Sequence, residues 1–387
     1  MTLQNIVIDT VSSKSNLDSF VKFPHLVYKD YPDWVAPLSF DEMKKLNRCK
    51  HPFFKRADAE FFMAHLNGEP VGRIAAILDH KYEFPDGEKG DTAYWGYFET
   101  VNDAAVANKL FEAANEWART KGCKRIIGPL SPSANDLAGL LIDNFHEPLV
   151  FMMSYNPEYY VNLVESFGHA KLTDLYAWLI PHAELPERTR NFAKKYLSRL
   201  EKEGINFRPI DMKDWNNELE KARVLFNNFE KVNPIYTPMT EEEFSYVAND
   251  MKMIIDPEFV FFAEHQGKPV GVSMTFPDMN ALFKPARGKL LSFVPRLLKY
   301  RLWRGLTSKS LIKQVRVTSM GLLEDYRGKG IDQIFYYLTG LAAEKRGIET
   351  AEFSWVDQDN LKMNNIARKF DKSMELYKTY RVYQHDL

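Results

Sequence analysis

One turn in the second half of the sequence has residues that could hold a phosphorylated ligand. It reads "EDYRGKGIDQ" at residues 324–333, between a β-branched stretch that predicts a strand and an apolar-spaced stretch that predicts a helix. A turn that leads into a helix presents unpaired backbone N–H groups and the positive end of the helix dipole to an anion. Gly328 and Gly330 permit close approach of a ligand, and Arg327 and Lys329 add positive charge. The sequence therefore predicts an anion site at this turn.

The elements that must position this turn occur twice in the chain. The segment "FMAHLNGEPVG" at residues 62–72 returns as "FFAEHQGKPVG" at residues 261–271, and each copy predicts a β-hairpin. Residues 95–122 match residues 320–347, and each of these segments predicts a strand end, a turn and a helix. The turn is therefore expected between the third strand and the long helix of a repeated unit.

A weaker match between the segments that begin at Tyr155 and Asp359 adds a short helix and a last strand to each half. The order of elements predicts two similar mixed α/β domains, residues 1–183 and 184–387, with a linker within residues 181–191. In the first domain Asn102 and Asp103 fall opposite the arginine and glycine of the second turn. We therefore expect a phosphate loop in the second domain alone.

The turn resembles the pyrophosphate loop of the GCN5-related N-acetyltransferase (GNAT) superfamily, which reads (Gln/Arg)-x-x-Gly-x-(Gly/Ala) and binds coenzyme A. Arg327 and Gly330 occupy its first two defined positions, and Asp332 occupies the third in place of a small residue. The following segment, "AEFSWVDQDNLKMNNIA", resembles the superfamily's next strand and asparagine-led helix. The resemblance covers most of the chain as two tandem folds, most like uncharacterised bacterial tandem acetyltransferase-like proteins. Asp332 has an alternative role as a helix-capping acid that points away from the ligand.

The resemblance implies acetyl-CoA or a longer acyl-CoA as co-substrate. No metal is expected, because neither Cys49 nor Cys123 has a second cysteine or histidine at metal-ligand spacing. For the proposed acyl transfer, we expect backbone N–H groups near Leu322 and Leu323 to polarise the thioester carbonyl. The residues expected to bind the co-substrate are Leu322, Leu323, Arg327, Gly328, Lys329, Gly330, Ile331, Asp332, Asn360 and Asn364.

Acyl transfer to an amine also needs a base for the amine proton and an acid for the leaving thiolate. Members of the superfamily often have a glutamate on the strand before the loop and a tyrosine in the late helix. Here that strand has no carboxylate, and Ala367 occupies the position of the tyrosine. The residues expected to substitute are Asp357 and Tyr377, with Asp359, Tyr380 and Tyr383 as neighbours of the same types. The alternatives are a turn or helix cap for the aspartates and sheet packing for the tyrosines.

The second half contains 26 extra residues before its third strand, which coincide with the basic insertion 281–306. Residues 284–316 include ten basic residues and no acidic one. A helix from Phe293 would bring Phe293, Leu297, Leu298, Leu302 and Trp303 onto one apolar face, with Arg296, Lys299, Arg301 and Arg304 near its polar side. Such a segment suits an acidic carrier protein, an anionic membrane surface or a long acyl chain, or else forms a lid on its own domain.

The first half has 21 extra residues within residues 128–160. Within them "DLAGLLI" predicts a short helix capped by Ser131, Ser133 or Asn135. Nearby aromatic and methionine side chains suit either a cleft between the halves or core packing. These side chains are Met152, Met153, Tyr155, Tyr159 and Tyr160.

The overall composition limits the location and the partners. The 387 residues are 45% hydrophobic with a net charge of −1, and the N-terminal residues have no apolar stretch of the kind a secretory signal needs. We therefore expect a cytoplasmic protein that does not bind nucleic acid. Cys49 and Cys123 are expected to be reduced thiols.

These patterns support two hypotheses about function. The first is an acyl-CoA-dependent N-acyltransferase that transfers an acetyl or longer acyl group to a small-molecule or peptide amine bound between the halves. The second is a catalytically inactive module of the same fold that binds or senses acyl-CoA or contacts another protein, which the missing acid and base would favour.

Overall fold

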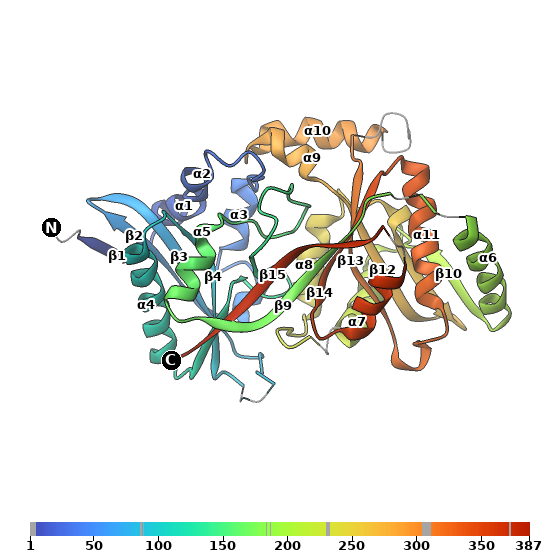
Figure 1. The fold of residues 1–387 in the computed structure, drawn as a ribbon, viewed down its shortest axis with the longest axis horizontal. Coiled ribbons are helices and arrows are strands. Elements are labelled where there is room, and N and C mark those ends of the chain that lie inside the picture. Colours follow the sequence, from blue (N-terminus) through green and yellow to red (C-terminus); the bar gives the residue numbers. More distant parts are fainter. Residues whose placement is uncertain are drawn as a thin grey trace.

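A computed structural model describes residues 5–85, 87, 89–182, 184–185, 187–229, 233–303, 311–370 and 373–387. Within these residues one mixed sheet runs through both halves of the chain (Figure 1), in the order β1-β2-β3-β4-β5-β15-β9-β14-β13-β12-β11-β10, with β8 beside β15. The expectation of a mixed α/β fold is confirmed.

The first half contributes β1 (Ile6–Thr10), α1 (Lys14–Lys22), α2 (Pro24–Val27), α3 (Ser39–Lys45), the 3₁₀ turn η1 (Pro52–Lys55), β2 (Ala57–Leu66), β3 (Glu69–Asp79), β4 (Thr92–Thr100), α4 (Ala104–Thr120), β5 (Arg125–Gly128), β6 (Leu130–Ser131), β7 (Leu137–Ala138), β8 (Leu140–Leu141), α5 (Tyr159–Ser166) and β9 (Ala170–Ile180). The second half contributes α6 (Glu187–Lys202), β10 (Ile205–Pro209), α7 (Trp215–Phe229), α8 (Glu241–Met251), η3 (Pro257–Phe259), β11 (Val260–His265), β12 (Lys268–Pro277), α9 (Asn280–Phe283), η4 (Lys284–Ala286), α10 (Leu290–Trp303), β13 (Gln314–Leu322), η6 (Glu324–Tyr326), α11 (Ile331–Arg346), β14 (Thr350–Asp357), α12 (Leu361–Phe370) and β15 (Glu375–Asp386).

The predicted hairpins are present in both halves. β2 pairs with β3, and β11 pairs with β12, in antiparallel register. The turn residues Asn67 and Gly68 have φ of 54° and 87°, and Gln266 and Gly267 have φ of 51° and 76°. Positive φ at both central residues matches the twist of the flanking strands, so each hairpin register is fixed locally.

The last strand of each half lies beside strands of the other half. β15 pairs with β5 of the first half, and β9 pairs with β14 of the second. β9 and β15 also pair with each other, from Glu375 opposite Leu179 to Gln384 opposite Ala170. The two crossing strands lie at the centre of Figure 1 and join the halves through backbone hydrogen bonds. The division at residues 183 and 184 stays a prediction, because residue 183 lies outside the described residues.

The prediction of a short helix in "DLAGLLI" is wrong. Leu137–Ala138 and Leu140–Leu141 are short strands, separated by Gly139 with φ of 78°. Leu141 pairs with Tyr380 of β15, and a Cβ on Gly139 would lie 2.9 Å from the Tyr380 Cβ. Pairing with a distant strand therefore overrides the local helical preference of this segment.

The segment that follows β8 packs against the second half. The backbone N–H of Phe151 donates to Asp278 Oδ1 at 2.9 Å, and Asn280 Nδ2 donates to the Leu149 carbonyl at 2.8 Å. Met153 and Tyr160 are buried in separate hydrophobic clusters. The sequence left the methionine and aromatic side chains of this region either in a cleft between the halves or in the core. Met153 and Tyr160 lie in the core.

The helix expected from Phe293 is present as α10, but its apolar side chains do not share one buried face. Phe293, Leu297 and Tyr300 are buried, whereas Leu298 and Leu302 are exposed. The expectation that Leu298 and Leu302 lie on the same face as Phe293 is therefore wrong. The side chain of Trp303 and the whole of Arg304 lie outside the described residues.

Replacement of Asp278 tests the contact between the halves. Burial raises the pKa of its carboxyl to about 6, from an ordinary 3.8. A raised pKa means that the folded state favours the protonated form, so this stabilisation is full below pH 3.8 and is lost as the pH rises through about 6. Asp278→Asn keeps an oxygen for Phe151 and cannot ionise. The free energy of unfolding of Asp278→Asn, relative to that of the wild type, should rise by roughly 3 kcal/mol between acidic and neutral pH.

The measurement is chemical denaturation of both proteins across this pH range. Asp30→Asn, a change at an exposed aspartate, serves as the matched control and should follow the wild-type curve. Parallel curves for wild type and Asp278→Asn would show that the carboxyl does not titrate between these limits.

Candidate acyl-transfer site

The predicted anion site lies at the start of α11. Gly330 is the N-cap residue with φ of 85°, and no side chain donates or accepts a capping hydrogen bond there. The first N–H groups of a helix have no partner within the helix, and here no capping side chain occupies them. Arg327 and Lys329 are exposed at the same turn, and Asp332 is partly exposed in the first turn of the helix.

Helix α6 packs along α11 and reaches the same turn. Arg199 donates to the carbonyl of Lys329 at 3.0 Å and lies over the ring of Tyr196 at 4.1 Å. A Cβ at Gly330 would lie 2.3 Å from the Tyr196 ring, so only glycine fits beneath this tyrosine. Arg199 is therefore a third basic side chain at the turn, beside Arg327 and Lys329. The sequence alone did not predict it there.

A small apolar crevice lies between α11, β14 and α12. Its lining residues are Tyr336, Phe353, Val356, Met363, Ile366, Ala367 and Met374. Its volume of about 10 Å³ is close to the minimum for one water molecule, so the pantetheine arm of coenzyme A could enter here only if the lining side chains moved apart. Ala367, expected at the position of the family's tyrosine, lies in this lining.

The strands β13 and β14 separate after Val317 and Phe353. Their parallel pairing covers only Gln314–Val317 and Thr350–Phe353. Three register shifts occur around this point, in β12–β13 next to Thr275, in β14–β9 after Phe353 and in β15–β9 after Leu376. Bulges redirect side chains and end pairing, and they are frequent next to active sites.

Glu352 lies at this divergence and its side chain is fully buried, with an exposed fraction of 0%. The hydroxyl groups of Tyr377 and Ser354 each donate to its carboxylate. Arg316 Nε lies 3.9 Å from Glu352 Oε1. Tyr377 is the unpaired residue at the β15 register shift, which explains how a strand residue can turn toward β14.

Burial dominates the electrostatics of this cluster. It raises the pKa of the Glu352 carboxyl, although Arg316, Ser354 and Lys378 act in the opposite direction. Burial also lowers the pKa of Arg316 to about 10 and lowers the pKa of the Lys378 ammonium group. A carboxylate whose pKa is raised is a stronger base than an ordinary one, which suits it to accept a proton.

Residues of the first half complete the environment of Glu352. Arg316 donates to the carbonyls of Phe151 and Met152 at 3.3 and 2.8 Å, and also to Ser354 Oγ at 2.8 Å. Lys378 Nζ donates to the carbonyl of Pro148 at 2.6 Å. The segment that follows β8 therefore covers the carboxylate and fixes both cations near it.

The other residues predicted for the site have mainly structural contacts. Asp357 accepts hydrogen bonds from Thr173 and from the backbone of Asp359, and burial raises its pKa. Asn360 accepts a bond from the N–H of Met363 near the start of α12. Asn364 accepts a bond from the Trp178 indole and donates to the Asp357 carbonyl.

The backbone of the strand before the turn is also largely paired. The N–H of Leu323 donates to the carbonyl of Val270 at 2.9 Å, and Leu322 lies opposite Gly271 in the β12–β13 ladder. Ile331 is buried as the first residue of α11, and Gly328 lies in open space with φ of 77°. Tyr377 and Glu352 come together, whereas Asp357 hydrogen-bonds elsewhere.

The equivalent turn of the first half differs. Asp103 caps α4 and accepts from the N–H groups of Ala105 and Val106 at 2.8 and 3.4 Å. The side chain thus occupies donors that Gly330 leaves open in the second half. Glu99 on the preceding strand is partly buried and accepts from Tyr28 and Tyr160 at 2.6 and 2.9 Å. This carboxylate is satisfied by tyrosines of its own half.

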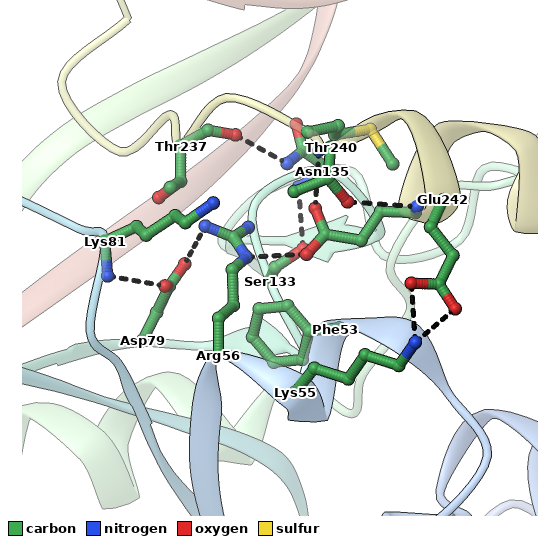
Figure 2. A network of polar contacts seen from close by, with 12 residues as sticks. Phe53, Lys55, Arg56, Asp79, Lys81, Ser133, Asn135, Thr237, Thr240 and Glu242 are labelled. Carbon is green, nitrogen blue, oxygen red and sulfur yellow. Dashed lines mark hydrogen bonds and ion pairs between the residues drawn. The ribbon is translucent and has the colours of Figure 1, made fainter.

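A larger cavity of about 720 Å³ lies between the halves, lined by η1, by Lys81 after β3 and by the start of α8. Figure 2 shows its polar wall, in which Arg56 points toward Asp79, at a distance of 3.1 Å. Arg56 also lies 2.7 Å from Glu243. Lys55 pairs with Glu242 at 2.5 Å. Because these charges compensate one another across the contact, we interpret the wall as a joint between the halves.

Two classes of feature are absent from the described part of the chain. No group of three or more histidine, cysteine, aspartate or glutamate side chains there is arranged to hold a metal ion. No helix among the described residues has the length and apolar character needed to cross a membrane.

Solved structures share this fold. A tandem GNAT protein from the clavulanic acid biosynthesis pathway aligns with a TM-score of 0.55 and 11% identity, covering 99% of this chain and 98% of its own. A GCN5-related N-acetyltransferase from Sphaerobacter thermophilus aligns with a TM-score of 0.51 and 13% identity, covering 98% and 95%. The fold is therefore that of a tandem GNAT protein, as the sequence resemblance implied.

Curated proteins give the relationship in sequence. The bacterial ceramide synthase of Caulobacter vibrioides is 31% identical over 100% of this chain and 99% of its own length. Protein YghO of Escherichia coli is 28% identical over 98% of this chain and 95% of its own length. A scan against models of protein families found no match. The chain belongs to the family of the Caulobacter bacterial ceramide synthase, and its own fold is that of the tandem GNAT proteins.

Lys329→Glu tests the anion site at the start of α11. Reversal of this charge should weaken coenzyme A binding by about 10-fold or more, because a charge-assisted contact to a phosphate contributes about 1.5–3 kcal/mol. Isothermal titration calorimetry with coenzyme A measures the effect. Lys213→Glu, at an exposed lysine before α7, is the matched control and should bind as wild type. Equal affinities of the two variants would refute the placement of the diphosphate.

Proposed function

We propose that the protein is an acyl-CoA-dependent N-acyltransferase whose acceptor is the amine of a long-chain amino alcohol. A ceramide is the N-acyl derivative of such an amine, and the name of the Caulobacter relative, which is 31% identical over the full chain, supports this acceptor class. The acyl donor would lie on the turn at Gly330, with its pantetheine arm in the apolar crevice once the side chains that line the crevice move apart. An acetyl donor, a peptide acceptor and a cytoplasmic location stay predictions from the sequence.

The observation that supports chemistry most strongly is the burial of Glu352 against Tyr377 at the divergence of β13 and β14. The amine nitrogen would attack the thioester carbonyl, forming the C–N bond as the C–S bond breaks. Glu352 would take the proton that the nitrogen loses, and Tyr377 would supply a proton to the leaving thiolate and regain one from Glu352. These two residues fill the roles of base and acid that the strand before the loop lacks.

The contacts of Arg316 suggest how the acceptor enters. Glu352 is fully buried, so an amine meets it only after neighbouring groups move. The cover on one side is the segment around Phe151 and Met152, held by two hydrogen bonds from Arg316 to backbone carbonyls. Long apolar chains would be accommodated among the apolar side chains of both halves once this segment shifts.

The experiment is product analysis with purified protein. Palmitoyl-CoA and sphinganine should give N-palmitoyl sphinganine by mass spectrometry, together with free coenzyme A thiol in equal amount. Acetyl-CoA with a short amine such as serinol serves as the contrast. Binding of palmitoyl-CoA without amide from either amine would instead favour the inactive acyl-CoA-binding module.

Tyr377→Phe and Glu352→Gln test the roles of the two catalytic residues. Loss of either group should lower kcat by about 100-fold or more while KM for acyl-CoA stays near the wild-type value, since general acid–base groups contribute about 10²–10⁴. Because burial raises the pKa of Glu352, wild-type kcat should rise with pH through that pKa, and Glu352→Gln should lose this dependence.

The matched control is Tyr383→Phe, which removes a hydroxyl from the same strand that donates to Glu165 at 3.0 Å. It should keep wild-type kcat. Thermal unfolding of all three variants separates a catalytic loss from a folding defect. Wild-type kcat in a folded Tyr377→Phe protein would remove Tyr377 from the mechanism.

A further inference from the structure

Helix α10 exposes an apolar stripe on the surface of the protein. Leu291, Val294, Leu298 and Leu302 are 91%, 42%, 51% and 78% exposed. Their spacing of three or four residues aligns them along one side of the helix, opposite the buried Phe293, Leu297 and Tyr300. The helix thus has two apolar sides, one packed on its own domain and one facing outward.

The first half adds to the same region. The N–H of Ser39 donates to the carbonyl of Gly288 at 3.1 Å, and a Cβ on Gly288 would lie 3.2 Å from the ring of His25. Next to these contact residues, Leu26 and Phe40 are 56% and 61% exposed. Figure 1 shows α2 and α10 along the same upper edge of the molecule.

Basic side chains flank the stripe. Lys289, Lys299 and Arg301 are exposed on or beside α10. By helical geometry Lys299 and Arg301 fall on opposite sides of the leucine stripe. No acidic residue occurs from residue 284 to residue 316. A helix with outward leucines between lysine and arginine side chains is typical of segments that lie in the interface of an anionic lipid bilayer.

We infer that the outward face of α10 docks on an anionic membrane surface, with its leucines among the lipid chains and its basic residues at the phosphate groups. This inference does not depend on the proposed acyl transfer, because it concerns binding of the protein to lipid alone. It would explain why exposed leucines occur in a basic segment, where water would favour polar side chains.

Two other occupants fit the surface less well. A second copy related by a twofold axis would bring the same basic face against itself, and like charges would repel. An acidic carrier protein would contact mainly charged groups, whereas Leu291 and Leu302 project further into solvent than any other large apolar side chain described. The membrane surface complements both the leucines and the charges.

Vesicle flotation tests the inference. The purified full-length protein is mixed with vesicles of phosphatidylcholine alone or of phosphatidylcholine with phosphatidylglycerol. Binding to the anionic vesicles should be at least tenfold stronger and should fall with added salt. Leu291→Ser with Leu302→Ser should reduce this binding at least tenfold, and Lys289→Glu with Arg301→Glu should remove the preference for anionic lipid.

Val224→Ser with Met253→Ser is the matched control, because both side chains are about half exposed on or after other helices. It should bind vesicles as wild type. Equal binding of the α10 leucine variant and this control would overturn the inference. The inference would also be overturned if the wild-type protein floated with neither kind of vesicle. This holds whether the protein then proves to form a dimer through α10 or to bind an acyl carrier protein there.

Discussion

The long antiparallel pairing of β9 with β15 is the constraint on which the rest of the structure depends. Each strand belongs to one half by sequence and also pairs with a strand of the other, β9 with β14 and β15 with β5. Backbone hydrogen bonds of a central ladder cannot be given up without leaving buried donors and acceptors unpaired. The halves are therefore parts of one sheet, and the register of this ladder fixes what meets at the centre.

The proposed chemistry follows from that register. Tyr377 lies at a shift in the β15–β9 pairing, and Ser354 lies at a shift in the β14–β9 pairing, so both hydroxyl groups meet the carboxylate of Glu352. A buried carboxylate is costly unless it is hydrogen-bonded and paired with cations. Here the second half provides Arg316 and Lys378, and backbone carbonyls of the first half orient them. A single half would leave these cations without their carbonyl partners.

Local patterns in the sequence predicted the elements, and distant pairing determined the centre of the site. The hairpin turns depend on neighbouring residues, and so do the strand, turn and helix around Gly330. The types and spacing of those residues were therefore sufficient to predict these elements. Glu352 was missed because strand pairing and two bulges bring it to Tyr377, and bulges leave no local pattern. The available signal was a charged residue in each of the apolar segments "VRV" and "AEF", since a charge in a buried strand requires a partner. For α10, the apolar residues were correctly placed in a helix, but their division between a buried and an outward face depended on packing against α9.

The central claim is that one acyl-CoA binds in the second half, with its thioester at the divergence of β13 and β14. A crystal structure with a non-hydrolysable thioether analogue of palmitoyl-CoA tests this most directly. The account predicts the diphosphate on the N–H groups at Gly330, the pantetheine arm in the crevice lined by Phe353 and Met363, and the sulfur near Ser354 and Glu352. An analogue seated instead at the Asp103 turn of the first half, or in the cavity beside Arg56, would contradict it.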